Sequence, residues 1–385
     1  MQVNYKEYLT ENVLKFWLDH SIDEKNGGIF TWLDREGNIY SSEKSVWFQG
    51  RALWSFAKAY NLIDRNEAYL KAAKTIYSFL PRCTDTDGRM FFKVTREGEN
   101  IQKRRYYFSE TFAAIGCAQY YKATGDQEAW RLAEFYFKTA RDCFADPTRN
   151  QPKYTIPAKA LSPAMIMMST ARAMAECAPD KEVYEALARQ YTQEVMHGGY
   201  FNEELGVLLE TVAPDGSFMD TPAGRTVNPG HSIETAWFLM AEGLLQKNDE
   251  ALALGKKILD LTMPLGLDKK YGGIISFVDC LGKPVTAMEW DMKLWWPQNE
   301  AVIANRMAYE IFGDAKYKED YESLRDYSFT HFEDKEYGEW YGYLHYDSTP
   351  STTLKGNVFK GPFHLPRMLM LMNEAENGRM MNYFA

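Results

Sequence analysis

Apolar side chains recur at helical spacing through most of the chain. The segment 4–20, for example, carries Val13, Phe16 and Trp17 in the pattern of an amphipathic helix. Helices with a more polar outer face are expected at 66–80, 127–143, 181–195, 249–261 and 315–332.

A second kind of helix alternates with these and is rich in small residues, as in Ala113–Ala118 and Ala301–Ala304. Six such helices begin near residues 47, 107, 163, 231, 297 and 364, about 60 residues apart. Most follow a glycine-containing turn and a short β-rich run, such as 26–38, which is typical of a hairpin. Small residues let neighbouring helices approach closely. The pattern predicts an all-α fold, an (α/α)6 barrel or toroid of twelve helices, with short β-hairpins in the inter-helix loops.

No Pro- or Ser-rich linker divides the sequence, so we expect residues 1–385 to form a single catalytic domain.

Three of the small-residue helices share a distinctive opening. In the first, Asn228 is a favoured N-cap and Pro229 suits the first helical position, where its missing N–H is not needed. Glu234 follows His231 by three residues, so both lie on one helix face.

The other two openings repeat this arrangement. Pro362 is expected to open the last helix, with His364 two residues later. Pro297 is expected at the start of the fifth, with Glu300 in its first turn. Three helices thus carry ionisable side chains at the same end, and two of these side chains are imidazoles.

A histidine in the first turn of a helix faces the positive end of the helix dipole, which disfavours imidazolium. A neutral imidazole can accept a proton near pH 7, and Glu234 or a similar partner can stabilise the imidazolium that forms. His231 and His364 are therefore the candidate acid/base residues. The remaining histidines fall at helix ends or in turns and are expected to be structural or peripheral: His20, His197, His331 and His345.

Composition narrows the possible partners. The net charge is −9 and no run of five basic residues occurs, so nucleic acid and anionic membrane are poor partners. Five cysteines without CxxC spacing are typical of reduced core thiols in a cytoplasmic protein. There is no signal-peptide pattern and no apolar run long enough to span a membrane. Aromatic residues reach 15%, which suits either a large core or a sugar-binding cleft.

Arg51 follows aromatic residues in the first small-residue helix, where a buried guanidinium could stabilise an enolate-like charge. We expect further cavity-lining, substrate-binding residues at Tyr107, Lys159, Trp295, Trp296, Gln298 and Arg367. Metal binding by His231, Glu234 and Glu300 is the rival interpretation, but no HExxH pattern supports it. Dinucleotide and phosphate-binding loops are absent from the sequence.

Several stretches, in order along nearly the whole chain, resemble the N-acylglucosamine 2-epimerase family. They are 47–51, 108–110, 228–234, 293–301, 337–344 and 360–367. The resemblance implies an (α/α)6 barrel that interconverts N-acetylglucosamine and N-acetylmannosamine. It also implies that His231 and His364 are the acid/base pair, with Arg51, Glu234 and Glu300 beside them.

The same resemblance implies an amino-sugar substrate, a homodimer and no required cofactor, with ATP as an activator that is not consumed in some members. Cellobiose or mannose 2-epimerases and aldose–ketose isomerases of the superfamily keep similar paired histidines. Where cellobiose epimerases carry an extra Asn and His, this chain has 165–169, Met-Ile-Met-Met-Ser, which counts against a disaccharide substrate. A glycoside hydrolase using Glu234 and Glu300 would leave the histidines idle. A non-catalytic sugar- or protein-binding relative would have no need of two first-turn histidines.

Overall fold

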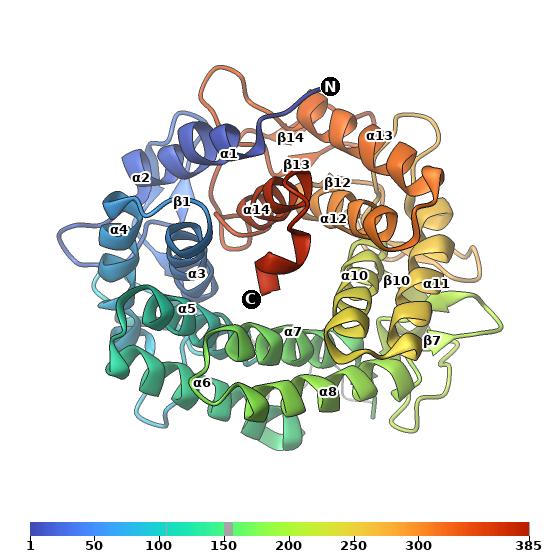
Figure 1. The fold of residues 1–385 in the computed structure, drawn as a ribbon, viewed down its shortest axis with the longest axis horizontal. Coiled ribbons are helices and arrows are strands. Elements are labelled where there is room, and N and C mark those ends of the chain that lie inside the picture. Colours follow the sequence, from blue (N-terminus) through green and yellow to red (C-terminus); the bar gives the residue numbers. More distant parts are fainter. Residues whose placement is uncertain (105, 150–156, 385) are drawn as a thin grey trace.

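Two concentric rings of helices make up the computed structural model, which describes residues 1–104, 106–149 and 157–384 (Figure 1). The inner ring consists of α3 (Val46–Leu62), α5 (Phe108–Thr124), α7 (Leu161–Cys177), α10 (Pro229–Gln246), α12 (Trp295–Phe312) and α14 (His364–Glu376). The outer ring consists of α1 (Tyr5–Glu7), η1 (Tyr8–Leu14), α2 (Lys15–Ser21), α4 (Glu67–Tyr77), α6 (Gln127–Ala145), α8 (Lys181–His197), α11 (Asp249–Gly266) and α13 (Ala315–His331). The predicted (α/α)6 barrel is confirmed.

Short antiparallel strands lie in the connections that lead into the inner helices. They are β1 (Trp32–Leu33) with β2 (Ile39–Ser41), β3 (Lys44–Ser45) with β4 (Lys93–Val94) and β5 (Asn100–Gln102), β6 (Lys159–Ala160) with β9 (Thr211–Val212), β7 (Phe201–Asn202) with β8 (Val207–Leu208), β10 (Thr226–Val227) with β11 (Val278–Asp279), and β12 (Lys293–Leu294) with β13 (Tyr343–Leu344) and β14 (Pro350–Thr352). The short helices are η2 (Leu80–Cys83), η3 (Pro147–Arg149), α9 (Pro222–Arg225) and η4 (Met380–Phe384). Because β3, β6, β10 and β12 end directly before an inner helix, the small sheets gather at the N-terminal ends of these helices.

Two of the predicted helix openings need correction. Asn228 and Pro229 act as predicted: Pro229 is the first helical residue, and the Asn228 side chain accepts a hydrogen bond from the backbone N–H of His231. The last helix, however, begins at His364, two residues after Pro362, and the fifth begins at Trp295, so Pro297 is its third residue. In both cases the chain is already extended or turned by a neighbouring strand or loop, so proline is not what starts the helix.

Gln298, predicted to line the cavity, instead braces a turn. Its amide nitrogen donates to the carbonyl of Ile274 (2.8 Å), and its amide oxygen accepts from the N–H of Ile274 (2.7 Å). Gln49 makes the same pair of bonds with Ile29 at the start of α3. Both partners follow a Gly-Gly turn, so the two glutamines are repeat-equivalent supports that fix the end of an inner helix to the preceding turn.

Close packing of the inner ring depends on glycine. A Cβ at Gly50 of α3 would lie 2.5 Å from the backbone carbon of Phe112 on α5, and a Cβ at Gly116 would lie 2.8 Å from the carbonyl oxygen of Gly50. These two helices therefore touch backbone to backbone. This is the close approach that the small-residue pattern predicted.

At the end of the barrel opposite the starts of the inner helices, η4 lies at the centre of the ring (Figure 1). Tyr383 and Phe384 line the cavity, and the buried ammonium of Lys58 donates to the carbonyl of Tyr383 at 2.5 Å.

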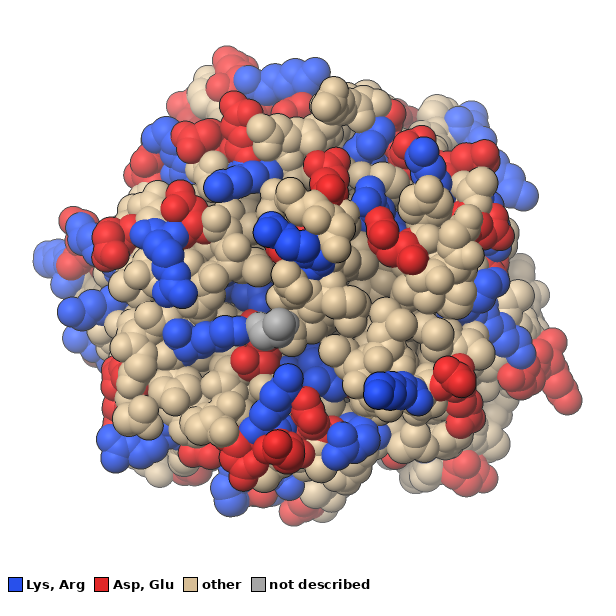
Figure 2. Space-filling view, viewed as in Figure 1, with Lys and Arg blue, Asp and Glu red and all other residues tan. Residues whose placement is uncertain are grey.

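Positive and negative side chains are interspersed over the face of the molecule that Figure 2 shows. Within the described residues, the helices are all too short or too polar to cross a membrane. The five cysteines are free, and four of them are buried.

The glycine contact gives a stability prediction. Gly50→Ala should destabilise the fold by about 1–3 kcal/mol, because the added methyl group overpacks the contact between α3 and α5. Alanine is the better helix former, so the helical propensity alone would act in the opposite direction. Urea unfolding followed by circular dichroism measures the change. Lys74→Ala on the exposed face of α4 is the control, expected to stay within about 0.5 kcal/mol; an unchanged or higher midpoint for Gly50→Ala would contradict the packing argument.

Candidate active site

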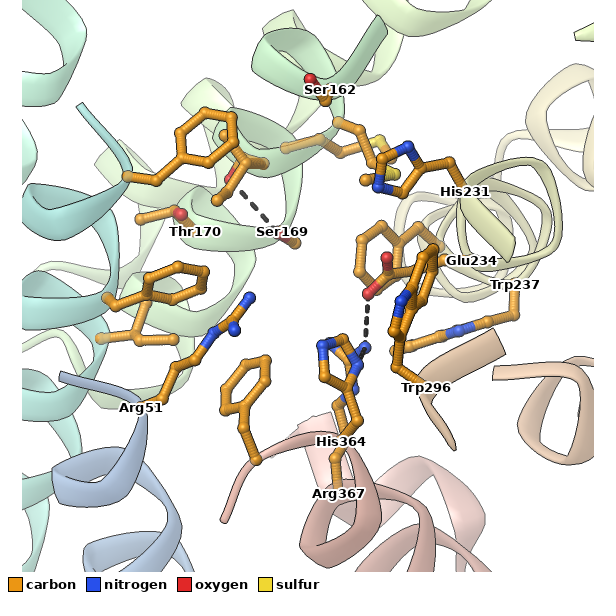
Figure 3. A pocket seen from close by; sticks show the side chains of 18 of the residues that line it. Arg51, Ser162, Ser169, Thr170, His231, Glu234, Trp237, Trp296, His364 and Arg367 are labelled. Carbon is orange, nitrogen blue, oxygen red and sulfur yellow. Dashed lines mark hydrogen bonds and ion pairs between the residues drawn. The ribbon is translucent and has the colours of Figure 1, made fainter. Parts of the chain in front are cut away.

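A cavity of about 720 Å³ occupies the centre of the barrel and receives side chains from all six inner helices. Its size is in the usual range for small-molecule sites. Of the residues singled out in the sequence, Arg51, His231, Glu234, Trp295, Trp296, His364 and Arg367 line it. Figure 3 shows Arg51, His231 and His364 directed toward this common space from three different helices.

His364 is held from behind by a buried carboxylate. Its Nδ1 lies 2.8 Å from Oε1 of Glu300, which is fully buried on the neighbouring helix α12. The other carboxylate oxygen of Glu300 accepts from the indole N–H of Trp237 at 2.9 Å. Because Nδ1 donates its proton to Glu300, the unprotonated Nε2 is left for the cavity. Glu300 itself is not among the residues that line the cavity; it fixes the orientation of the His364 imidazole.

Arg367, one turn after His364, supplies the compensating positive charge. Its Nη2 lies 2.7 Å from Oε1 of Glu300 and also bonds to the carboxylate of Glu234. Burial alone would lower the pKa of Arg367, but Glu300 and Glu234 together raise it. Burial raises the pKa of Glu300, and Arg367 opposes this shift. The guanidinium thus lets Glu300 remain an anion inside the protein.

The same surroundings keep His364 neutral. Its pKa is held well below the usual range, first by burial and then by the positive charges of Arg367 and Arg51. The sequence predicted a depressed pKa from the helix dipole; burial and the two guanidinium groups account for it here. A neutral imidazole whose Nε2 faces the cavity is suited to accept a proton.

His231 has its own carboxylate, contributed by a residue that the sequence did not reveal. Glu210, in the turn between β8 and β9, places both carboxylate oxygens 3.0 Å from Nδ1 of His231. The expected partner, Glu234, lies on the same helix but binds Arg367 instead. Sequence spacing could not have identified Glu210, because it is 21 residues from His231 and reaches it only when β9 pairs with β6.

Trp296 connects the two imidazoles. Its ring centroid lies 5.1 Å from that of His231 and 5.7 Å from that of His364. The two imidazoles therefore flank one aromatic side chain within the same cavity (Figure 3). A small substrate lying on this indole would have an imidazole at each side.

Arg51 faces the histidines and forms no ion pair with a carboxylate within the described residues. Its guanidinium carbon lies 4.2 Å from the ring centroid of Phe112, and Nη1 donates to the carbonyl of Phe359 at 3.2 Å. Nε has no hydrogen-bond partner within the described residues. Burial, followed by the charge of Arg367, lowers the pKa of Arg51 to about 9, so the group remains cationic at neutral pH. It is a charged donor available to an oxygen of a ligand.

Three of the predicted substrate-binding residues do not line the cavity. Gln298 braces a turn, as described above. Tyr107 is the N-cap of α5 and is buried. Lys159, on β6, lies 3.8 Å from Glu194 of the outer helix α8. Propensity and motif position placed these three near the cavity, but the side chains turn outward or into the scaffold.

One group of three residues has the spacing of a metal site: ligand atoms of Glu234, Glu300 and His364 lie within 4.8 Å of one another. The guanidinium of Arg367 is already bonded to both carboxylates and lies 3.2 Å from Nδ1 of His364. A cation of the protein's own thus fills the position that a metal ion would take. These residues do not fit a metal site.

The sequence and the structure of this chain are similar to those of known proteins. Residues 28–360 match the sequence model of the N-acylglucosamine 2-epimerase (GlcNAc 2-epimerase) family. The N-acylglucosamine 2-epimerase of Bos taurus is 33% identical over 383 residues, covering 95% of this chain and 89% of that protein. The structure of cellobiose 2-epimerase from Bacillus thermoamylovorans B4167 superposes with a TM-score of 0.85 at 21% identity, over 97% of this chain and 98% of that one. A D-mannose isomerase also reaches 0.85, at 19% identity over 97% of each chain.

The environment of His364 gives a prediction about pH. The folded-state pKa lies below the ordinary value near 6.5, so the unfolded chain takes up a proton first as pH falls. The contribution of His364 to stability is therefore complete above about pH 6.5 and is lost as pH falls toward the folded-state pKa.

Imidazole nitrogen shifts in NMR should show His364 neutral at pH 6. The free energy of unfolding should also decline less steeply between pH 6.5 and 5 in His364→Gln than in the unsubstituted chain. A His364 that titrates at or above 6.5 would contradict the assignment.

Proposed function

This chain belongs to the N-acylglucosamine 2-epimerase family, and we propose that it interconverts N-acetyl-D-glucosamine and N-acetyl-D-mannosamine by moving a proton at C2. The observation that supports this most directly is the pair of imidazoles on either side of Trp296, each oriented through Nδ1 by its own carboxylate. An epimerisation needs a base on one face of a carbon and an acid on the other.

The sugar must first open, so that C2 lies next to the C1 aldehyde. A proton beside a carbonyl is acidic only if the enolate oxygen that develops is stabilised. Arg51 is a cationic donor that faces the histidines and, in the part of the chain that the structure describes, forms no ion pair with a carboxylate, so it is suited to bind that oxygen. One imidazole removes the C2 proton, and the other returns a proton to the opposite face, which gives the epimer.

The two histidines are prepared differently for this exchange. His364 is buried beside two guanidinium groups, which favours the neutral, proton-accepting form. His231 is half-buried, and its Nδ1 lies 3.0 Å from both carboxylate oxygens of Glu210. The two imidazoles thus lie in unequal environments, and the reaction needs one as the base and the other as the acid.

The proposed chemistry asks for no metal or redox cofactor, since Arg51 carries the charge stabilisation and the imidazoles carry the protons. Activation by ATP without its consumption, a cytoplasmic location and a homodimeric assembly stay predictions from family resemblance and composition. A 2-epimerase of unsubstituted hexoses or of cellobiose, or an aldose–ketose isomerase, would use the same proton transfer on another sugar, and a binding protein would use none.

Incubation with N-acetylmannosamine in heavy water tests the proposal. We expect N-acetylglucosamine to accumulate with deuterium at C2, visible by proton NMR as loss of the C2 signal. Mannose, glucose and cellobiose serve as comparison substrates. If no deuterium enters C2 of the amino sugar, or if a plain hexose is turned over faster, the assignment to N-acylated hexosamines is wrong.

In the same assay, His231→Ala and His364→Ala should each lower the epimerisation rate by a factor on the order of 10²–10⁴, the usual effect of losing a positioned acid or base. Each variant should still exchange the C2 proton of one of the two epimers if each histidine serves one face. Near-normal epimerisation by either variant would overturn the two-base scheme.

Glu210→Gln should lower kcat by roughly tenfold to a hundredfold, less than loss of the imidazole itself. The limb of the pH–rate profile that reports His231 should move to lower pH, because its protonated form loses an anionic partner. A purely structural role for Glu210 would lower the rate without moving that limb. Glu203→Gln, at an exposed position of the neighbouring β7–β8 turn, is the control and should leave the profile unchanged.

A further inference from the structure

The wall of the cavity formed by α7 mixes polar and apolar side chains, and its apolar members are Met165, Ile166, Met168 and Ala173. Met165 and Ile166 line the cavity from the second turn of this helix. Ser162, three residues before them, and Ser169, three residues after, also line it. The cavity face of α7 thus presents a small apolar patch with a hydroxyl group one turn away on each side. A sugar ring, with a hydroxyl on nearly every carbon, has little to offer such a patch.

This patch lies about one helical turn from His231, one of the two proposed acid/base residues. The sulfur of Met165 is 3.0 Å from the hydroxyl of Thr235 on α10. Thr235 follows His231 by four residues, so it lies one turn deeper in the barrel on the same helix face. Met165 is therefore fixed one helical turn below the His231 ring, and Figure 3 shows the α7 wall, marked by Ser162 and Ser169, next to that histidine.

We propose that Met165 and Ile166 form the subsite that binds the acyl group on the C2 nitrogen; this rests on the function proposed above. The C2 carbon must lie at the level of the imidazoles, since they exchange its proton. In a trans amide, the acyl methyl carbon lies about 3.8 Å from C2, the same separation as between consecutive Cα atoms. One turn of helix rises about 5.4 Å. An acyl group that points into the barrel from C2 therefore brings its methyl group to the level of Met165.

The subsite also explains how one cavity handles both epimers. The acyl nitrogen is bonded to the carbon that inverts, so a fixed acyl group holds C2 between the two bases while its configuration changes. Burial of the methyl group against Met165 and Ile166 gives binding that a 2-hydroxyl sugar cannot obtain, because its hydroxyl would face an apolar wall without a partner. The patch selects the acyl group by its apolar end.

The test compares kcat/KM for N-acetylmannosamine and N-glycolylmannosamine, which differ only by a hydroxyl on the methyl carbon of the acyl group. Met165→Gln keeps the length of the side chain but makes its end polar. It should raise the glycolyl-to-acetyl ratio of kcat/KM by about tenfold, in the range that one small group contributes to specificity. Ile166→Thr, a smaller change, should move the ratio in the same direction.

Ala173→Ser is the matched control. This residue also lines the cavity from α7, but it lies two turns further along the helix from Ile166 and should leave the ratio unchanged. A general loss of folding would lower both substrates alike and leave the ratio as it was, so the ratio separates the subsite from a structural effect. Equal ratios in the unsubstituted chain and both variants would overturn the subsite while leaving the proposed function intact. Failure of the unsubstituted chain to epimerise either amino sugar would overturn the proposed function and the subsite with it.

Discussion

The active site is built on one buried charge arrangement, in which the guanidinium of Arg367 lies between the carboxylates of Glu234 and Glu300. Removing one partner of a buried ion pair leaves an uncompensated charge, which costs several kcal/mol. Arg367 therefore allows Glu300 to remain an anion, and Glu300 fixes His364. Burial, together with the positive charges of Arg367 and Arg51, lowers the pKa of that imidazole.

The barrel makes this arrangement possible because it brings the beginnings of its inner helices to one end. Residues of α10, α12 and α14 that are more than 60 positions apart in the sequence come within hydrogen-bond distance there. The supports of that end are repeated along with the helices. Lys44 pairs with Asp23 and Lys293 with Asp268, both fully or nearly fully buried, each beneath a Gly-Gly turn that a glutamine braces. The same supports are therefore repeated at the starts of different inner helices. Some side chains at these helix starts hold the scaffold together, and others reach the cavity.

The proposed proton-transfer residues and the apolar patch of α7 lie in different parts of the cavity. The imidazoles lie in the first turns of α10 and α14, and Met165 packs against Thr235, one turn beyond His231 on α10. Proton-transferring groups thereby surround one atom of a ligand, and apolar surface is offered to a group three bonds further on. A substrate with both features fits only in one orientation, which is the requirement for acting on a single carbon.

The sequence by itself determined the alternation of two helix types, their number, the start of α10 at Asn228 and Pro229, and the choice of His231, His364 and Arg51 as residues that face one cavity. These follow from periodicity, capping and residue type, which act over a few residues. Only the tertiary structure decided that Glu210 is the partner of His231, that Glu234 binds Arg367, and that Gln298 is a brace. Such pairings join separate segments, and their geometry depends on how the ring closes, which no local pattern encodes.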